Sequence, residues 1–175
     1  MSEKEEILLD LLRRSGRKLH GMLTRLTLNE DIAEDLMQDL FIRLCQLGNP
    51  EAIKNLEAYA CRAAINLAFD WQRKQKGSFK TLSENFADTG IPNVDRQMIQ
   101  NERLEPILSA VEQLRGDMRE CFVLHYIEQM DYPQIAERTQ KNPQQVRALC
   151  SKGIHRIRQI LNVQNAPFYK EAINE

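Results

Sequence analysis

The residues whose types and spacing most clearly indicate chemistry lie in the stretch Tyr132–Arg158. Between Arg138 and Ile160 the chain has six Arg or Lys residues and no Asp or Glu. Asp131 and Asn142 are residue types that cap helices, and the proline directly after Asn142 suits a first helical position. Two short helices joined by a tight turn form a helix-turn-helix, whose second helix enters the major groove of DNA. The pattern therefore predicts this motif.

The second helix of the motif is expected to turn its apolar residues inward and to present amides, cations and small side chains. Such groups can reach base edges and phosphates in a major groove. The predicted DNA-contacting residues are Gln144, Gln145, Arg147, Ala148, Ser151 and Lys152. One residue counts against the motif, because Gln140 occupies the turn position where glycine is usual, and a left-handed conformation there costs about 1 kcal/mol. The alternative is a solvated basic helix in an all-α bundle.

A second charged pattern lies in residues 29–44, where five acidic residues stand against a single arginine. The apolar residues recur at helical spacing, and Asn29 is a suitable N-cap. Asp31, Asp35, Gln38 and Asp39 then share the face opposite the core, with Ile42 among them. An apolar centre with a polar rim is typical of a protein interface. A merely solvated acidic face is the alternative.

The third charged pattern is cationic and belongs to a helix expected from about Asn55 to Lys76. One arc of this helix combines cations with an amide and an aromatic ring, which suits single-stranded DNA because phosphates meet cations and unstacked bases meet rings. The residues of this arc are Arg62, Asn66, Phe69, Arg73 and Lys76. Phe69 has an alternative place at the edge of the core. Tyr59 and Trp71 are expected in the core.

Composition limits the class of protein. The chain has 175 residues and a net charge of −1, and it has no run approaching the roughly 18 apolar residues that a membrane span needs. Its acidic start is unlike a secretion signal, so we expect a cytoplasmic protein without membrane insertion.

The four cysteines of the chain are far apart within apolar helical patterns, which indicates reduced core thiols. No zinc spacing, nucleophile–base set or phosphate loop is present, so neither a cofactor nor catalysis is expected.

The periodicity predicts an all-α fold of two small helical domains joined by a linker. Three amphipathic helices occupy residues 1–77, and residues 78–101 have turn formers without a stable period, as in an extended linker. Residues 102–163 form a four-helix domain that contains the helix-turn-helix, and residues 164–175 form a tail whose role stays open.

Three blocks in this order resemble the extracytoplasmic-function group of bacterial sigma factors. The segment AEDLMQDLFIRL looks like the polymerase-binding part of the family's region two, and NLEAYACRAAINLAFDWQRKQK looks like its DNA-opening part. The segments LRGDMRECFVLHYIEQMDYPQIAERT and VRALCSKG are similar to region four, which contains the promoter-reading helix-turn-helix. The resemblance covers nearly the whole chain.

The resemblance implies an alternative sigma factor, a subunit that binds core RNA polymerase and directs transcription initiation at specific promoters. Region two would open the minus-ten element of promoter DNA, where Asn66 matches the asparagine associated with the flipped base, and region four would read the minus-thirty-five element. The polymerase-binding residues implied are Asp35, Gln38, Asp39, Ile42 and Arg43. Family members have no catalysis of their own and are commonly held by an anti-sigma factor.

The chain departs from the family pattern at a few positions. Ala148 and Leu149 replace the commoner Ser-Arg pair, so an unusual minus-thirty-five sequence is expected. Gly153 stands where alanine is common and could permit close packing, and the loop LGNPEAIKN has no aromatic residue to complete a base pocket. The rival hypotheses are a stand-alone helix-turn-helix regulator, which needs no polymerase-binding face, and a helical adaptor that binds only proteins.

Overall fold

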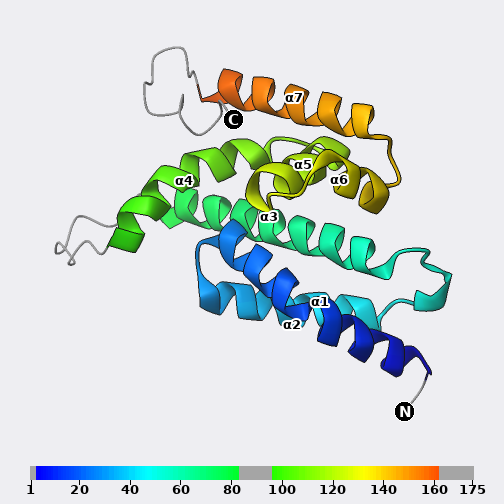
Figure 1. The fold of residues 1–175 in the computed structure, drawn as a ribbon. Helices are drawn as coiled ribbons and strands as arrows, with labels where there is room; N and C mark the ends of the chain where they lie inside the picture. Colours follow the sequence, from blue (N-terminus) through cyan, green and yellow to red (C-terminus); the bar gives the residue numbers. More distant parts are fainter. Residues whose placement is uncertain (1–2, 83–95, 162–175) are drawn as a thin grey trace. The chain divides into compact units, whose positions relative to one another are not determined.

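The computed structural model describes residues 3–82 and 96–161, with side chains described for residues 4–75 and 104–161, and all regular elements in these ranges are helices. The chain forms two compact units, one built from α1 to α3 and the other from α4 to α7 (Figure 1). The predicted all-α fold with two helical groups is confirmed. The tail 164–175 lies outside the described residues.

The first unit is a bundle of three long helices. Its elements are α1 (Glu3–Thr27), α2 (Glu30–Cys45), the short 3-10 helix η1 (Pro50–Ala52) and α3 (Leu56–Leu82). Each of the three long helices packs against the other two. The fully buried side chains include Leu23 and Leu26 of α1, Leu40 and Leu44 of α2, and Ile65 of α3. Burial of each such side chain stabilises the fold by about 2 kcal/mol.

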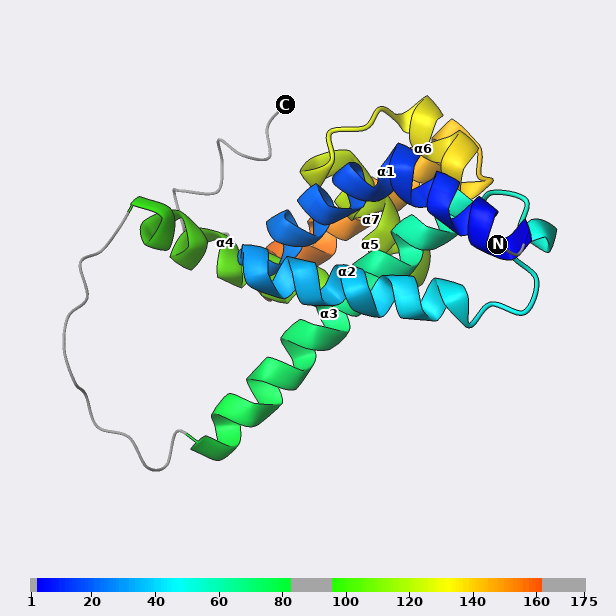
Figure 2. The same ribbon diagram turned by 90° about the horizontal axis from the view of Figure 1, so that it is seen from below.

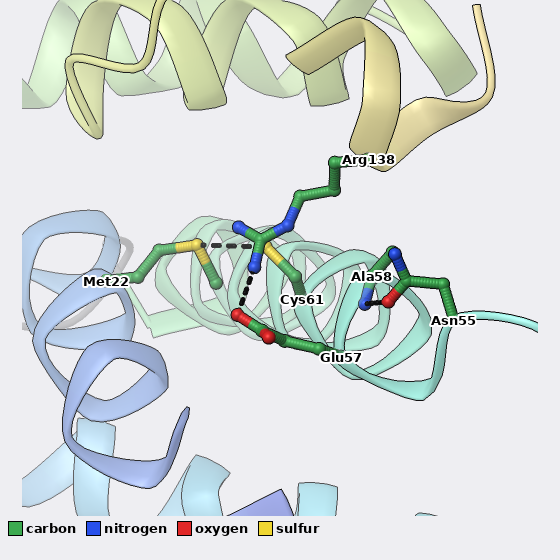
Figure 3. Close-up of polar contacts among 6 residues, drawn as sticks. All are labelled: Met22, Asn55, Glu57, Ala58, Cys61 and Arg138. Atoms are coloured by element: carbon green, nitrogen blue, oxygen red, sulfur yellow. Dashed lines mark hydrogen bonds and ion pairs between the residues drawn. The ribbon is translucent and has the colours of Figure 1, made fainter. Parts of the chain in front are cut away.

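Asparagine side chains begin three of these helices. The Oδ1 atom of Asn29 accepts a hydrogen bond from the Ile32 amide at 3.1 Å, as the sequence predicted. Asn49 caps η1 in the same way, and Asn55 accepts from the Ala58 amide at 2.9 Å (Figure 3). Each cap satisfies an amide that has no partner inside its helix. The helix starts are therefore fixed locally by the sequence.

Two contacts along α3 attach it to α1. The Gln72 side-chain amide donates to the Leu26 carbonyl at 2.6 Å, which satisfies a carbonyl in the last turn of α1. The Sγ atom of Cys61 lies 3.8 Å from Sδ of Met22 (Figure 3). Beyond Gln72 the C-terminal part of α3 extends past α1 and α2 (Figure 2). This part of the helix is the one that contains most of the cations.

The second unit comprises α4 (Arg96–Glu112), α5 (Gly116–Phe122), η2 (Val123–Ile127), α6 (Tyr132–Thr139) and α7 (Pro143–Ile160). Its core includes the fully buried Val111, Leu114, Leu124, Ile135 and Ile157. Helix α7 packs against both α4 and α5.

Gly153 allows α7 to approach α5 closely. A Cβ atom at this residue would lie 3.3 Å from Cδ2 of Phe122, 3.5 Å from Cδ1 of Leu114 and 3.6 Å from Cγ of Met118. The glycine costs about 1 kcal/mol of helix propensity relative to alanine, and this cost is offset by the close packing. The sequence-based expectation of close packing at Gly153 agrees with these contacts.

The helices extend further into the segment predicted as a linker than the pattern indicated. Helix α3 continues to Leu82 rather than ending near Lys76, and α4 begins at Arg96 rather than near Glu102. The single Gly77 within α3 costs only about 1 kcal/mol, which the neighbouring helix-forming lysines and glutamines can offset.

Candidate nucleic-acid interface

Helices α6 and α7 form the predicted helix-turn-helix, and both begin with a reciprocal cap. Oδ1 of Asp131 accepts from the Gln134 amide at 2.8 Å, while the Asp131 amide donates to Oε1 of Gln134 at 3.1 Å. At α7, Oδ1 of Asn142 accepts from the Gln145 amide at 2.8 Å, and the Asn142 amide donates to Oε1 of Gln145 at 3.0 Å. Both predicted caps are confirmed, with Pro143 in the first turn of α7.

The turn between the two helices has the left-handed conformation that the motif requires. Gln140 has φ of +57°, and the Lys141 amide donates to the Ala136 carbonyl at 3.0 Å. This bond and the left-handed residue together form a Schellman ending of α6. Gln140 therefore adopts the conformation that the sequence identified as costly.

The outward face of α7 presents all the residues predicted to contact duplex DNA. Val146, Cys150 and Ile157 are buried on the opposite face, which fixes the rotation of the helix about its axis. The exposed residues are Gln144, Gln145, Arg147, Ala148, Ser151 and Lys152. Gln145 also serves the cap, so its side-chain oxygen already has a partner.

An aromatic stack positions Arg147. Its guanidinium carbon lies 5.3 Å from the centre of the Tyr132 ring, within the range of a cation–π interaction. The Tyr132 ring is stacked on His125 at 4.4 Å between centroids. Nδ1 of His125 lies 2.8 Å from the Met130 carbonyl, and because a carbonyl can only accept, this nitrogen carries the hydrogen. The first turn of α6 and the η2 segment thus hold an arginine of α7.

One cation of the basic segment is used inside the unit. Nζ of Lys141 forms a 2.7 Å ion pair with Oδ2 of Asp117, and the Lys141 side chain is mostly buried. This pair joins the turn to α5. Lys141 is therefore a structural cation, whereas Arg147 and Lys152 are exposed.

The arc of α3 predicted to bind single-stranded DNA is only partly as expected. Arg62, Asn66 and Arg73 are exposed, and Arg73 forms a 3.2 Å ion pair with Asp70. Phe69 is 0% exposed, so the prediction that its ring faces DNA is wrong. At the edge of the core, burial stabilises a ring without polar atoms by about 2 kcal/mol or more, and this decided its place. The side chain of Lys76 lies outside the described residues.

The aromatic side chain of this arc is Tyr59 instead. Its side chain is 41% exposed, although the sequence analysis placed it in the core. Tyr59, Arg62, Asn66 and Arg73 are spaced by three, four and seven residues, so they follow one face of the helix. The phenolic oxygen of Tyr59 makes its partial exposure less costly than exposure of Phe69 would be. This difference between the two rings could have predicted from the sequence which of them is exposed.

The acidic face of α2 is exposed as predicted. Ala33, Leu36, Leu40 and Leu44 are buried, and the residues proposed to bind the polymerase lie on the outer side: Asp35, Gln38, Asp39, Ile42 and Arg43. Ile42 is 52% exposed, and next to it Phe41 is 37% exposed. Exposed carboxylates therefore lie along α2 from its first turn to Asp39, and the exposed apolar side chains lie next to them toward its C-terminal end.

Other kinds of site find little support in the described part of the chain. Among these residues no group of three or more His, Cys, Asp or Glu side chains could hold a metal ion. No described helix is long and apolar enough to cross a membrane.

Comparison with known proteins gives matches to both units. The family model for Sigma-70 region 2 matches residues 11–78, and that for Sigma-70 region 4 matches residues 104–157. The chain is 23% identical to the ferric citrate uptake sigma factor FecI of Escherichia coli (strain K12) over 138 aligned residues. These residues make up 78% of this chain and 80% of that protein. A solved structure that matches is the sigma factor RpoE in complex with the anti-sigma factor NepR from Bartonella quintana. The match has a TM-score of 0.48 and 21% sequence identity, and it covers 91% of this chain and 96% of that chain.

The two matched regions contain the three charged surfaces and stand in the order of a promoter-recognition subunit. The chain belongs to the sigma-70 family of bacterial RNA polymerase sigma factors. Within that family it is a sigma factor of the extracytoplasmic-function group, which directs the polymerase to its promoters.

Proposed function

We propose that three separate surfaces of this sigma factor divide the work of promoter recognition in the cytoplasm. The exposed face of α2 binds core RNA polymerase, the outward face of α7 reads the minus-thirty-five element, and the exposed arc of α3 binds the opened minus-ten strand. The observation that carries the proposal is the outward face of α7, where amides, cations and small residues are exposed on a helix that a capped helix-turn-helix positions.

The face of α7 has the chemistry of a duplex reader. Arg147 can donate two hydrogen bonds to a guanine edge, and Lys152 can neutralise a phosphate. The Tyr132 ring limits the conformations of the Arg147 side chain, so less entropy is lost when it binds a base. Because Ala148 replaces a more usual serine, this helix has one hydroxyl fewer for base recognition.

The arc of α3 has the chemistry of a single-strand binder. An unstacked base can stack on the Tyr59 ring, a second base edge can bond the Asn66 amide, and phosphates can pair with Arg62 and Arg73. These groups extend along more than three helical turns, or about 20 Å. The arc can therefore follow several nucleotides of one strand.

The face of α2 has the chemistry of a protein interface. Ile42 and Phe41 supply an apolar centre, and Asp35 and Asp39 supply a charged rim. A partner that complements this face presents cations beside an apolar patch. Neither a stand-alone DNA-binding regulator nor a solvated helix requires this combination.

The decisive experiment measures binding to purified core polymerase and core-dependent transcription from a library of random promoters. We expect specific initiation, and we expect Ile42→Glu to weaken core binding by about tenfold because it places a charge in the apolar centre. Leu104→Glu is the matched control, since Leu104 is an exposed aliphatic residue of α4 outside this face.

Two outcomes would contradict the proposal. If core polymerase binds the protein no better than an unrelated helical protein, the proposed docking function fails. Equal effects of Ile42→Glu and Leu104→Glu would show that the face of α2 is not the docking surface.

A further inference from the structure

A cationic groove lies in the second unit between α7 and the start of α5. Its volume is about 640 Å³, and the residues that line it include the apolar Leu114 and Met118. The lining also includes the cations Arg115, Lys152 and Arg156, and no carboxylate is found among the described residues that line the groove. The groove therefore attracts anions.

The groove is continuous with the outward face of α7. Ser151 and Lys152 belong to both, so a ligand on that face reaches the groove without a break. Arg115 comes from the residue before α5, where its side chain makes no capping hydrogen bond. A second chain segment thus adds a cation that the α7 helix alone does not supply.

Distance along α7 indicates which part of a duplex the groove meets. A helix rises about 1.5 Å per residue, so Arg156 lies about 17 Å along the axis from Gln145. A major groove is only about 12 Å wide. If the first turns of α7 read base edges, Arg156 has passed beyond the bases and lies at the sugar-phosphate backbone.

Hydrogen bonds along α7 orient Arg156, one of the cations that line the groove. Nη1 of Arg156 donates to Oε1 of Gln159 at 3.4 Å, and Nε2 of Gln159 lies 3.1 Å from Nε2 of His155. These contacts use one edge of the guanidinium. A phosphate can be bound by its other donors.

We propose that this groove binds the backbone phosphates of duplex DNA beside the bases that α7 reads, through Arg115 and Arg156. The proposal rests on the proposed role of α7. An acidic protein segment would be attracted by the same charge, but the shared residues Ser151 and Lys152 favour the ligand that already occupies the recognition face. Arg115 and Arg156 then set the register of the helix on DNA without reading sequence.

The test uses holoenzyme assembled from core polymerase and full-length Arg115→Gln or Arg156→Gln protein. Its probes are a duplex from a promoter that the wild-type holoenzyme transcribes and a scrambled duplex of the same composition. Each lost phosphate contact makes the slope of log affinity against log salt concentration less steep by about 0.9. A tenfold rise in salt then weakens the DNA affinity of the variant by roughly eightfold less than it weakens that of the wild type. We expect this reduction on both duplexes, with the preference for the promoter unchanged.

Arg17→Gln is the matched control, because Arg17 is an exposed arginine of α1. An unchanged salt dependence of DNA affinity in both groove variants would overturn the proposal. If these variants also bind core polymerase more weakly, the groove binds an acidic protein segment instead of DNA. If wild-type holoenzyme fails to prefer the promoter duplex, the proposed role of α7 fails and this inference fails with it. If the preference is present and only the variant slopes are unchanged, this inference alone is wrong.

Discussion

Arg147 shows how the surrounding structure can position a single residue for the DNA contact that we propose for it. A surface arginine loses rotamer freedom when it binds a base, and a ring that already holds its guanidinium reduces that loss. Tyr132 is such a ring, and it is itself held by its stack on His125. In the role proposed for α7, its specificity therefore depends on residues that lie outside the helix.

We expect Tyr132→Leu to reduce discrimination at the base pair that Arg147 reads by about two- to fivefold, because an exposed cation–π contact contributes about 0.5–1 kcal/mol. Tyr132→Phe keeps the ring and should keep the discrimination. Competition binding with cognate and single-pair-substituted duplexes measures the effect, and thermal unfolding verifies that both variants fold. Identical behaviour of the Leu and Phe variants would contradict the positioning role.

The cysteines show which residue properties the sequence pattern could and could not predict. Cys61, Cys121 and Cys150 are buried, as predicted, whereas Cys45 in the last turn of α2 is exposed and that prediction was wrong. Burial raises the pKa of Cys121 to about 12 and that of Cys150 to about 11. Since the thiolate is the reactive form, these two thiols stay protonated and unreactive at neutral pH.

At the scale of the element, most helix starts followed from local chemistry, because the capping residue and the amide that it binds are three residues apart. Asn29, Asp131 and Asn142 were therefore predictable. The end of α3 and the start of α4 were not, because a weak propensity difference decides them. The burial of Phe69 and the exposure of Tyr59 depended on tertiary packing around the core. Helical periodicity alone carries no information about that packing.

The turn of the helix-turn-helix offers a test at this scale. Replacement of Gln140 by glycine should stabilise the protein by about 1 kcal/mol, because glycine adopts positive φ without a steric cost. Gln129 has φ of +55°, so Gln129→Gly should act in the same direction. Gln46→Gly is the contrasting control, because Gln46 has φ of −80° at the end of α2. Urea unfolding measures all three.

Stabilisation by Gln46→Gly equal to that by Gln140→Gly would contradict this explanation. Such a result would mean that the left-handed conformation of Gln140 is not the source of the cost. If Gln140→Gly lowers the free energy of unfolding instead, the contacts of the glutamine side chain stabilise the protein by more than the left-handed backbone conformation costs.

At the scale of the whole molecule, the two units contribute different chemistry. The first unit exposes the face of α2 that we propose for protein binding and the arc of α3 that we propose for single-strand binding, whereas the second exposes the face of α7 that we propose reads duplex DNA. Net charge gives no indication of this arrangement, since the total is −1. The two helical domains and their order could be predicted from sequence because each helix has its own periodicity and charge pattern.

Separate surfaces predict separable defects. Arg147→Ala should weaken holoenzyme binding to closed duplex promoter by about tenfold, because it removes a base contact. Asn66→Ala should leave that affinity nearly intact and reduce strand opening, measured by the reactivity of unpaired thymines to permanganate. If both variants impair both steps equally, the proposed division between α3 and α7 is wrong.

The cap of α7 restricts what Gln145 can read. An adenine edge is recognised when a glutamine presents an oxygen and an NH₂ group side by side. In this structure the oxygen is turned back to the Asn142 amide, which leaves the NH₂ group as the part of the side chain that can face DNA. If α7 reads DNA as proposed, Gln145 is thereby suited to acceptor atoms such as guanine O6 or thymine O4, whereas recognition of adenine would require its oxygen to break the hydrogen bond from the Asn142 amide.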